Sequence, residues 1–361
     1  MEDYLHPENI EQPVLRRVEY DGELSHITRI WAINLALFFA TLSFYRFWGR
    51  TRIRQYVWTH TNILGSRLEY TGTGGELLKG FLVVLPLYIV LSFLNGAFPK
   101  LGGAFTILFV IIGFFAIFSS MRYRVTRSVW RGIRGFMGKD GYNAYQTLSF
   151  KRHVIDFLSL GITIPRSQLL RWQCLVEQIS VGRQHVQFFF DSKGLALSNI
   201  ATLIIGAIAG VVIGSIVSGF FMGLLPTDAS NERETLGGLF VIAMTLAFGC
   251  GYLAFYAIRQ YYVADLVRRR FSGILIGPVR FYTFYTRAQF IRFKLINMII
   301  ILGSLGLGGA FILHRKASFF GNYLATSGEF SDEGISNMYD GGNMVAEGFL
   351  DSFGFDIGIF S

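Results

Sequence analysis

Four long segments of the sequence contain no Asp, Glu, Lys or Arg, and they constrain the fold more than any other feature. Their lengths bracket the roughly 20 residues that an α-helix needs to cross the hydrocarbon core of a bilayer. The whole chain is only 16% charged, whereas soluble domains carry about 25% charged residues. We therefore expect a polytopic membrane protein. The four segments are Gly80–Gly96, Leu101–Met121, Asn199–Leu225 and Leu236–Ile258.

Three shorter apolar segments, at about 30–46, 153–164 and 291–313, have basic residues on both flanks. Lys and Arg in short connections mark the cytoplasmic side of a membrane, so a single crossing would place one basic flank outside. We therefore favour re-entrant segments that enter and leave on the cytoplasmic side, with seven ordinary spans as the alternative. The predicted regions are a polar segment at 1–28, a membrane domain at 29–316 with long spans at about 80–96, 102–120, 199–225 and 236–258, and an acidic tail at 317–361.

A basic, aromatic helical pattern followed by a glycine and a short alternation recurs along the chain. The four copies lie at 47–70, 122–136, 166–188 and 259–284, and glycines at 132, 135 and 138 weaken the second copy. We interpret each copy as a helix, a glycine turn and a short strand. The sequence thus predicts an all-α membrane protein with internal repeats of membrane helices, basic interfacial helices and short cytoplasmic β-strands.

The basic and aromatic residues of the first and last copies lie directly after apolar segments. Arg side chains can reach lipid phosphates from such positions, while Trp lies at the level of the headgroups. We expect contacts with anionic headgroups, either as an anchor without a specific ligand or as a specific lipid or metabolite site. The predicted interfacial residues are Arg50, Arg52, Arg54, Trp48, Trp58, Arg268, Arg269 and Arg270.

The long spans contain no ionisable side chain of the Asp, Glu, Lys, Arg or His type, whereas the shorter segments contain polar residues. Asn34, His153, Asp156 and Asn297 all lie in these shorter segments. Broken helices with polar residues at membrane depth form ligand sites in transporters, so these four residues are a candidate polar centre. In the alternative interpretation, each residue only satisfies the backbone at its own helix break.

Gly206, Gly210 and Gly214 recur every four residues in the third long span. Such a row lies on one helix face and lets a second backbone approach closely. We expect it to pack within the molecule or between copies of the chain, and a narrow pore lined by this face is the alternative.

Known catalytic patterns are absent from the sequence. Gly72-x-Gly74-Gly75 lacks the Lys and Ser/Thr of a phosphate loop, and Thr73 with Glu76 instead predicts a capping box for the next helix. The histidines and the two cysteines have no metal-ligand spacing. We therefore expect no catalytic residue, no metal, no cofactor and no nucleic acid, and a non-enzymatic role.

Two long motifs and the tail resemble the YjgN family of bacterial inner-membrane proteins. The motifs are INLALFFATLSFYRFWGRTRIRQYVWTHTNILGSRLEYTGTGGELLKGF and RYRVTRSVWRGIRGF, and the tail is GNYLATSGEFSDEGISNMYDGGNMVAEGFLDSFGFDIG. The resemblance implies a multi-pass location in the bacterial inner (plasma) membrane, but it supplies no reaction. Genes of this kind are often encoded beside a membrane zinc metallopeptidase, which makes that enzyme a candidate partner.

Two functions follow as hypotheses. The first is a permease-like or channel-like protein whose broken helices surround a polar centre. The second is a lipid-binding membrane scaffold or partner subunit that grips anionic headgroups and docks another protein through its acidic tail. A homo-oligomer is compatible with both.

Overall fold

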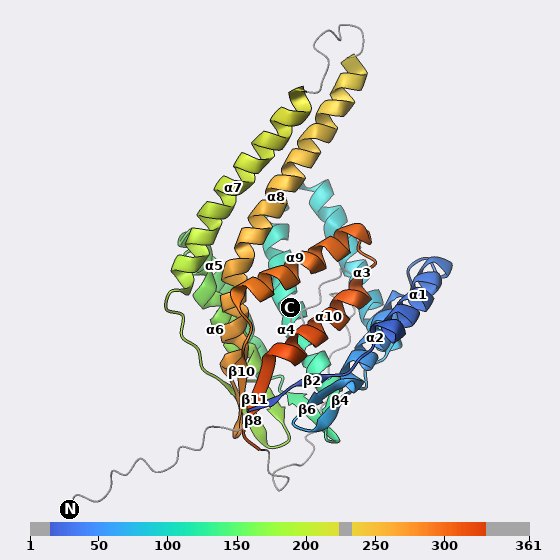
Figure 1. Ribbon diagram of the computed structural model, residues 1–361, viewed down its shortest axis with the longest axis vertical. Helices are drawn as coiled ribbons and strands as arrows, with labels where there is room; N and C mark the ends of the chain where they lie inside the picture. The colour runs from blue at the N-terminus through green and yellow to red at the C-terminus, as the bar shows by residue number, and fades with distance from the viewer. Residues whose placement is uncertain (1–14, 224–232, 330–361) are drawn as a thin grey trace, which may run out of the picture.

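The helices of the protein come in consecutive pairs, and each pair leads into strands of one sheet (Figure 1). The structure is a computed structural model that describes residues 15–223 and 233–329, with side chains described outside 233–239. The helix pairs in this part of the chain are α1 (Leu24–Ala40) with α2 (Arg46–Thr59), α3 (Gly74–Ala97) with α4 (Gly102–Arg127), α5 (Gly141–Leu158) with α6 (Ile164–Val176), α7 (Leu195–Gly223) with α8 (Arg233–Ser272), and α9 (Arg287–Gly303) with α10 (Gly309–Tyr323).

The strands form one 11-stranded antiparallel sheet, so the prediction of an all-α protein with only short strands is wrong. Each strand alone is short, but strands of successive repeats pair edge to edge, and a sheet of many strands is stable where a single hairpin is marginal. The strands are β1 (Leu15–Arg17), β2 (Glu19–Tyr20), β3 (Thr61–Ile63), β4 (Ser66–Tyr70), β5 (Ser128–Trp130), β6 (Ile133–Met137), β7 (Ile179–Val181), β8 (Gln184–Phe188), β9 (Ile274–Ile276), β10 (Val279–Thr283) and β11 (Leu324–Ser327).

The β-hairpins repeat the same register from copy to copy. Two-residue turns connect β3 to β4, β5 to β6, β7 to β8 and β9 to β10. In the first turn, Leu64 and Gly65 have φ values of 52° and 79°, as in the primed turns whose twist matches that of the flanking strands. All four turns therefore lie at one rim of the sheet, and the helix pairs leave from the opposite rim.

The glycines of the second copy do not weaken its hairpin. Arg131 and Gly132 have φ values of 51° and 74° and form the same kind of turn as in the first copy. At Gly135, a Cβ atom would lie 2.6 Å from the carbonyl oxygen of Val125, so the glycine allows α4 to approach β6. The local sequence looks degenerate because this copy packs its helix more tightly onto the strand.

The N-terminal strand closes the sheet into a nearly complete ring. β1 pairs with β11 and β2 pairs with β3, so the first segment of the described chain lies between the last repeat and the first. The backbone N–H of Val18, between β1 and β2, donates to the carbonyl oxygen of Leu324 at 3.0 Å. The predicted polar segment 1–28 therefore supplies the strand that completes the barrel-like sheet.

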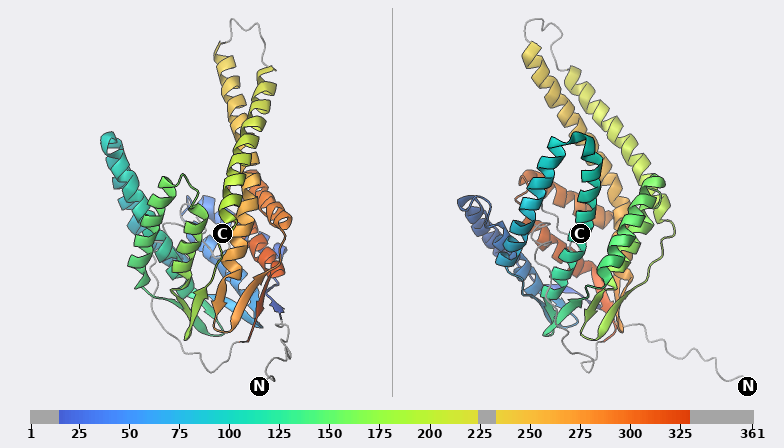
Figure 2. Two further views of the ribbon diagram at one scale, coloured as in Figure 1. Left: turned by 90° about the vertical axis from the view of Figure 1, so that its left-hand side faces the viewer. Right: turned by 180° about the vertical axis from the view of Figure 1, so that it is seen from behind.

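Two of the helix pairs are long and apolar enough to cross a membrane, and they extend away from the strand ring (Figure 2). The candidate spans are Gly74–Ala97, Pro99–Arg127, Leu195–Gly223 and Phe240–Ser272. The capping box predicted at Thr73 and Glu76 is confirmed at the start of α3. The three shorter apolar segments each fold as a helix, a tight turn and a second helix.

The hydrophobic core lies where the bases of the helices meet the ring. One cluster includes Met137, Leu169 and Phe188, and a second includes Phe290 and Phe320. These clusters fix the helix ends above the strands, so side chains in the last turns of the helices point over the interior of the ring.

Candidate functional site

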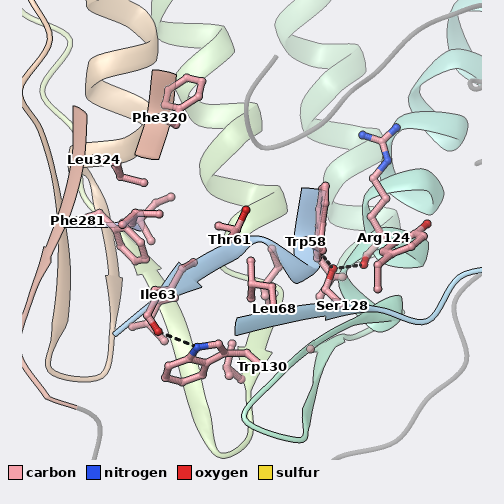
Figure 3. Close-up of a pocket in the computed structure, with 18 of the residues that line it drawn as sticks. Trp58, Thr61, Ile63, Leu68, Arg124, Ser128, Trp130, Phe281, Phe320 and Leu324 are labelled. Atoms are coloured by element: carbon pink, nitrogen blue, oxygen red, sulfur yellow. Dashed lines mark hydrogen bonds between the residues drawn. The ribbon is translucent and has the colours of Figure 1, made fainter. Parts of the chain in front are cut away.

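The strand ring encloses a cavity of about 290 Å³, which we call the ring cavity. Its wall is formed by inward-facing strand residues and by the final turns of helices such as α2, α4 and α10. Figure 3 shows Arg124 on the helix side of this cavity and Trp130 toward the hairpin turns. The volume is close to the lower end of the range of about 300–1,000 Å³ that small-molecule pockets occupy.

Every second residue of a strand faces inward. The inward-facing residues that line the ring cavity are mostly apolar, so its strand wall is apolar. Leu68, Val186 and Phe281 occupy the same register position in three copies, and all three line the cavity. The indole N–H of Trp130 donates to the carbonyl oxygen of Ile63 at 3.1 Å. Since this polar edge is already bonded, the ring of Trp130 presents apolar surface to the cavity.

The helix side of the ring cavity carries positive charge. Arg54, Arg124 and Lys316 line it, and Arg54 and Arg124 are only 5% and 8% exposed. Among the described residues that line the cavity, none is Asp or Glu. These cations place positive charge on the helix side of an otherwise largely apolar cavity.

Further cations lie beside the cavity. Lys294 on α9 lies near Lys316 and Arg270, and burial together with these two neighbours lowers the pKa of Lys294 to about 8. The Lys294 ammonium lies 5.4 Å from the centroid of the Phe290 ring. The guanidinium of Arg270 lies over Trp172, which itself lines the cavity. In the described part of the chain, cations therefore lie beside the cavity as well as at its wall.

The predicted interfacial residues of α2 divide between the ring cavity and the outer surface. Arg54 and Trp58 line the cavity. Arg52 is exposed and lies over the ring of Tyr45, Trp48 is exposed, and Arg50 is half-buried. One helix thus presents cations both to the interior of the ring and to the outside.

The predicted interfacial residues of α8 contact neighbouring loops and helices. Arg268 donates to the carbonyl oxygen of Tyr285 at 2.6 Å. Arg269 donates to the carbonyl oxygens of Asp191 and Lys193. Arg268 and Arg269 therefore tie the end of α8 to the segments that precede α7 and α9, whereas Arg270 lies against Trp172.

Two residues of the predicted polar centre, Asn34 and Asn297, bond within their own helix pairs. Asn34 donates from Nδ2 to the carbonyl oxygen of Gly49 at 3.1 Å, between α1 and α2. Asn297 accepts from Nε of Arg315 at 2.9 Å, between α9 and α10. These contacts hold the two helices of each pair together below the turn.

The other two residues of the predicted centre lie in the third helix pair. The Asp156 carboxylate accepts from the hydroxyls of Thr163 and Ser167 at 2.8 and 2.6 Å, and it lies 3.5 Å from Arg171. His153 is exposed and its ring packs edge-on against Phe114 of α4. Asp156 therefore has the same bracing geometry as Asn34 and Asn297.

The glycine row of α7 faces α8. A Cβ atom at Gly210 would lie 2.9 Å from the carbonyl oxygen of Gly251, and one at Gly214 would lie 3.2 Å from that of Ala247. At Gly206, the nearest atom would belong to the ring of Phe255. The two longest helices therefore meet backbone to backbone along this face.

Sequence reasoning did not identify Arg124, Lys294 and Lys316 as site residues. For Arg124 and Lys316, the signal lies in the repeat itself, because a cation occurs within about two turns of the first strand in each copy. The cations in these positions are Arg54, Arg124, Arg171, Arg270 and Lys316. Their apolar neighbours suggested lipid exposure, whereas ring closure turns several of them inward.

Comparisons with known proteins identify the family. The family model described as "Bacterial protein of unknown function (DUF898)" matches residues 16–352. "Inner membrane protein YjgN" of Escherichia coli (strain K12) is 21% identical over 197 residues, which are 54% of this chain and 43% of that protein. The protein of the same name from Salmonella typhimurium (strain LT2) is 31% identical over 106 residues, which are 29% of this chain and 27% of that protein.

The chain spans less than half the length of these curated relatives. No solved structure matches it. The predicted resemblance to the YjgN inner-membrane proteins is confirmed by the relatives, and since the family model covers most of the sequence, the chain belongs to the DUF898 family of bacterial proteins.

Proposed function

We propose that this protein is a multi-pass inner-membrane protein that binds an anionic amphiphile in the ring cavity. The apolar part of the ligand occupies the strand-lined interior, and its anionic group meets Arg54, Arg124 and Lys316 on the helix side. The single observation that carries the proposal is a largely apolar cavity inside the strand ring whose described charged lining residues are all cations.

The location of the cavity suits such a ligand. The relatives are inner-membrane proteins, and α3, α4, α7 and α8 are long and apolar enough to cross that membrane. The basic connections favour a cytoplasmic position for the strand ring. The anionic headgroups of the cytoplasmic leaflet are then the nearest source of a ligand that carries both a negative charge and an apolar chain.

An amphiphile gains from both parts of the site. A hydrogen bond to a charged group contributes about 1.5–3 kcal/mol, and each methylene buried from water contributes about 0.8 kcal/mol. A small anion gains only the hydrogen bond to the charged group. Affinity is therefore expected to increase about fourfold per added methylene until the chain fills the cavity.

Native mass spectrometry of the full-length protein tests the proposal. Protein from nanodiscs of mixed phosphatidylglycerol and phosphatidylcholine is expected to retain phosphatidylglycerol preferentially. Lys316→Gln is expected to reduce this retention about tenfold or more, because one charge-assisted contact is lost. Arg292→Gln, which removes an exposed cation on α9, is the matched control.

Two substitutions on β8 test the position of the chain. Val186 faces the cavity, whereas its neighbour Gln187 is exposed on the other side of the strand. Val186→Trp should fill the cavity and abolish retention, while Gln187→Trp should retain lipid like the wild type. Equal retention by the two variants, or by the wild type and Lys316→Gln, would contradict the proposed site.

The permease-like or channel-like hypothesis has less support. Asn34, Asp156 and Asn297 each bond across their own helix pair, and this geometry favours bracing of the pair over a shared transport centre. The proposed docking of a protein partner by the acidic tail at 317–361 falls mostly on residues beyond 329, which lie outside the described residues.

A further inference from the structure

The three short helix pairs end in turns with the same backbone. Leu42, Leu160 and Leu305 each have a φ of 49°. In the turn between α5 and α6, the N–H of Leu160 donates to the carbonyl oxygen of Phe157, and the N–H of Gly161 donates to the carbonyl oxygen of Asp156, at 3.1 and 2.8 Å. The other two turns have equivalent bonds. This pattern satisfies the last carbonyls of the first helix within the turn itself.

Leucine is an unexpected residue at this position. Helices of this kind usually end with glycine in the left-handed conformation, because the Cβ atom of an L-residue is sterically strained there. Leu42, Leu160 and Leu305 are nevertheless 84%, 93% and 91% exposed. Their side chains gain little from packing inside the protein, so the strained leucines indicate an apolar environment outside it.

The sequence around each apex is also suited to an apolar environment. Residues 30–45, 157–165 and 295–313 contain no Asp, Glu, Lys or Arg. Large apolar neighbours such as Phe39, Phe157 and Leu302 are exposed as well. Each apex is thus a continuous apolar surface, rather than a single exposed leucine of the kind found on any soluble protein.

All helix pairs leave the strand ring on the same side, and the three short apices lie at comparable heights beside the longer pairs (Figure 1). We propose that Leu42, Leu160 and Leu305 insert into the membrane leaflet next to the ring and that their helix pairs return without crossing. The occupant of this surface is the bilayer that α3–α4 and α7–α8 cross.

The lengths of the short helices support a return within the leaflet. The helix α6, which follows the Leu160 turn, has 13 residues. Its length is therefore about 20 Å at 1.5 Å per residue. A bilayer core is about 30 Å thick. The bonded turns also meet the requirement that no backbone group remain unpaired in hydrocarbon.

Site-specific fluorescence of the full-length protein tests this inference. Leu42→Cys, Leu160→Cys and Leu305→Cys are made separately in a background that lacks Cys174 and Cys250, labelled with an environment-sensitive fluorophore and placed in oriented vesicles. Gln187→Cys, on the exposed side of β8, is the control. We expect a blue-shifted emission at each apex, quenching by a lipid-attached quencher, and protection from aqueous iodide on both sides of the membrane.

Each alternative result has a defined meaning. Quenching by iodide added on the ring side would show that the apices are in water and would overturn the proposal. Quenching from the opposite side would show that the short pairs cross the bilayer, which would overturn it as well. Since three apices are tested independently, failure of one variant to fold leaves the other two decisive. Lipid binding in the ring cavity does not affect either outcome.

Discussion

At the scale of single residues, Lys294 connects the electrostatics of the ring cavity to a measurable property. Its pKa is lowered from 10.5 to about 8 by burial and by Lys316 and Arg270. The folded, ligand-free protein therefore holds this proton less tightly than the unfolded chain does. Through this group, the free energy of unfolding rises as the pH increases from about 8 to 10.5.

Binding of an anion should have the opposite pH dependence. Below pH 8 the Lys294 ammonium is charged and attracts the ligand, and above this pH the amine becomes neutral. We expect the affinity for phosphatidylglycerol, whose charge is constant over this range, to fall between pH 7 and pH 9. Lys294→Arg should remove most of this fall because a guanidinium stays charged. Binding titrations of both proteins at the two pH values measure the effect, and an identical pH dependence would exclude Lys294 as its source.

The sequence revealed which residue types form the site but not which way they point. Arg52 and Arg54 are two positions apart on α2, yet Arg52 is exposed and Arg54 lines the ring cavity. A basic, aromatic helix beside an apolar segment is also typical of a membrane interface. Only the closure of the ring distinguishes the inner from the outer face, and no local pattern encodes that closure.

At the scale of elements, the backbones of the long helices α7 and α8 approach each other closely. Gly210 and Gly251 meet here, and a Cβ atom at Gly251 would lie 2.5 Å from the carbonyl oxygen of Gly210. Small residues at such a contact allow the van der Waals packing that joins helices in a membrane. The glycine row was visible in the sequence, but its partner helix was not.

Gly210→Leu should separate α7 from α8 and destabilise the protein by about 1–3 kcal/mol or more, as overpacking does. Gly219→Leu is the matched control on the same helix, because a Cβ atom there meets nothing within 4 Å. The midpoint of thermal unfolding in detergent measures both effects. A similar midpoint for the two variants would mean that the glycine row does not hold the helix pair together.

The elements themselves were largely predictable, and their assembly was not. The long apolar helices and the helix–turn–strand repeats follow from charge-free length and from periodicity. The pairing of β1 with β11 joins residues about 310 positions apart, such as Leu15 and Ser327. Strands of two to five residues carry too little pattern to indicate such a partner, so the sequence did not predict the sheet.

At the scale of the whole molecule, five helix pairs rise from one rim of a nearly closed ring in the described part of the chain. Two pairs are long enough to anchor the protein across the membrane, and we propose that the other three enter only one leaflet. This arrangement would hold the cationic side of the ring cavity next to the headgroups. The proposed ligand could then reach the cavity without leaving the membrane surface.

Photo-crosslinking tests the central claim most directly. Phosphatidylglycerol with a photoactivatable group at the end of one acyl chain is incorporated into nanodiscs with the full-length protein, and the adducts are located by peptide mass spectrometry. We predict adducts on inward-facing strand residues such as Leu68, Val186 and Phe281, and their loss when unlabelled phosphatidylglycerol competes. Adducts confined to the lipid-facing surfaces of α3, α4, α7 and α8 would contradict a lipid-binding cavity inside the ring.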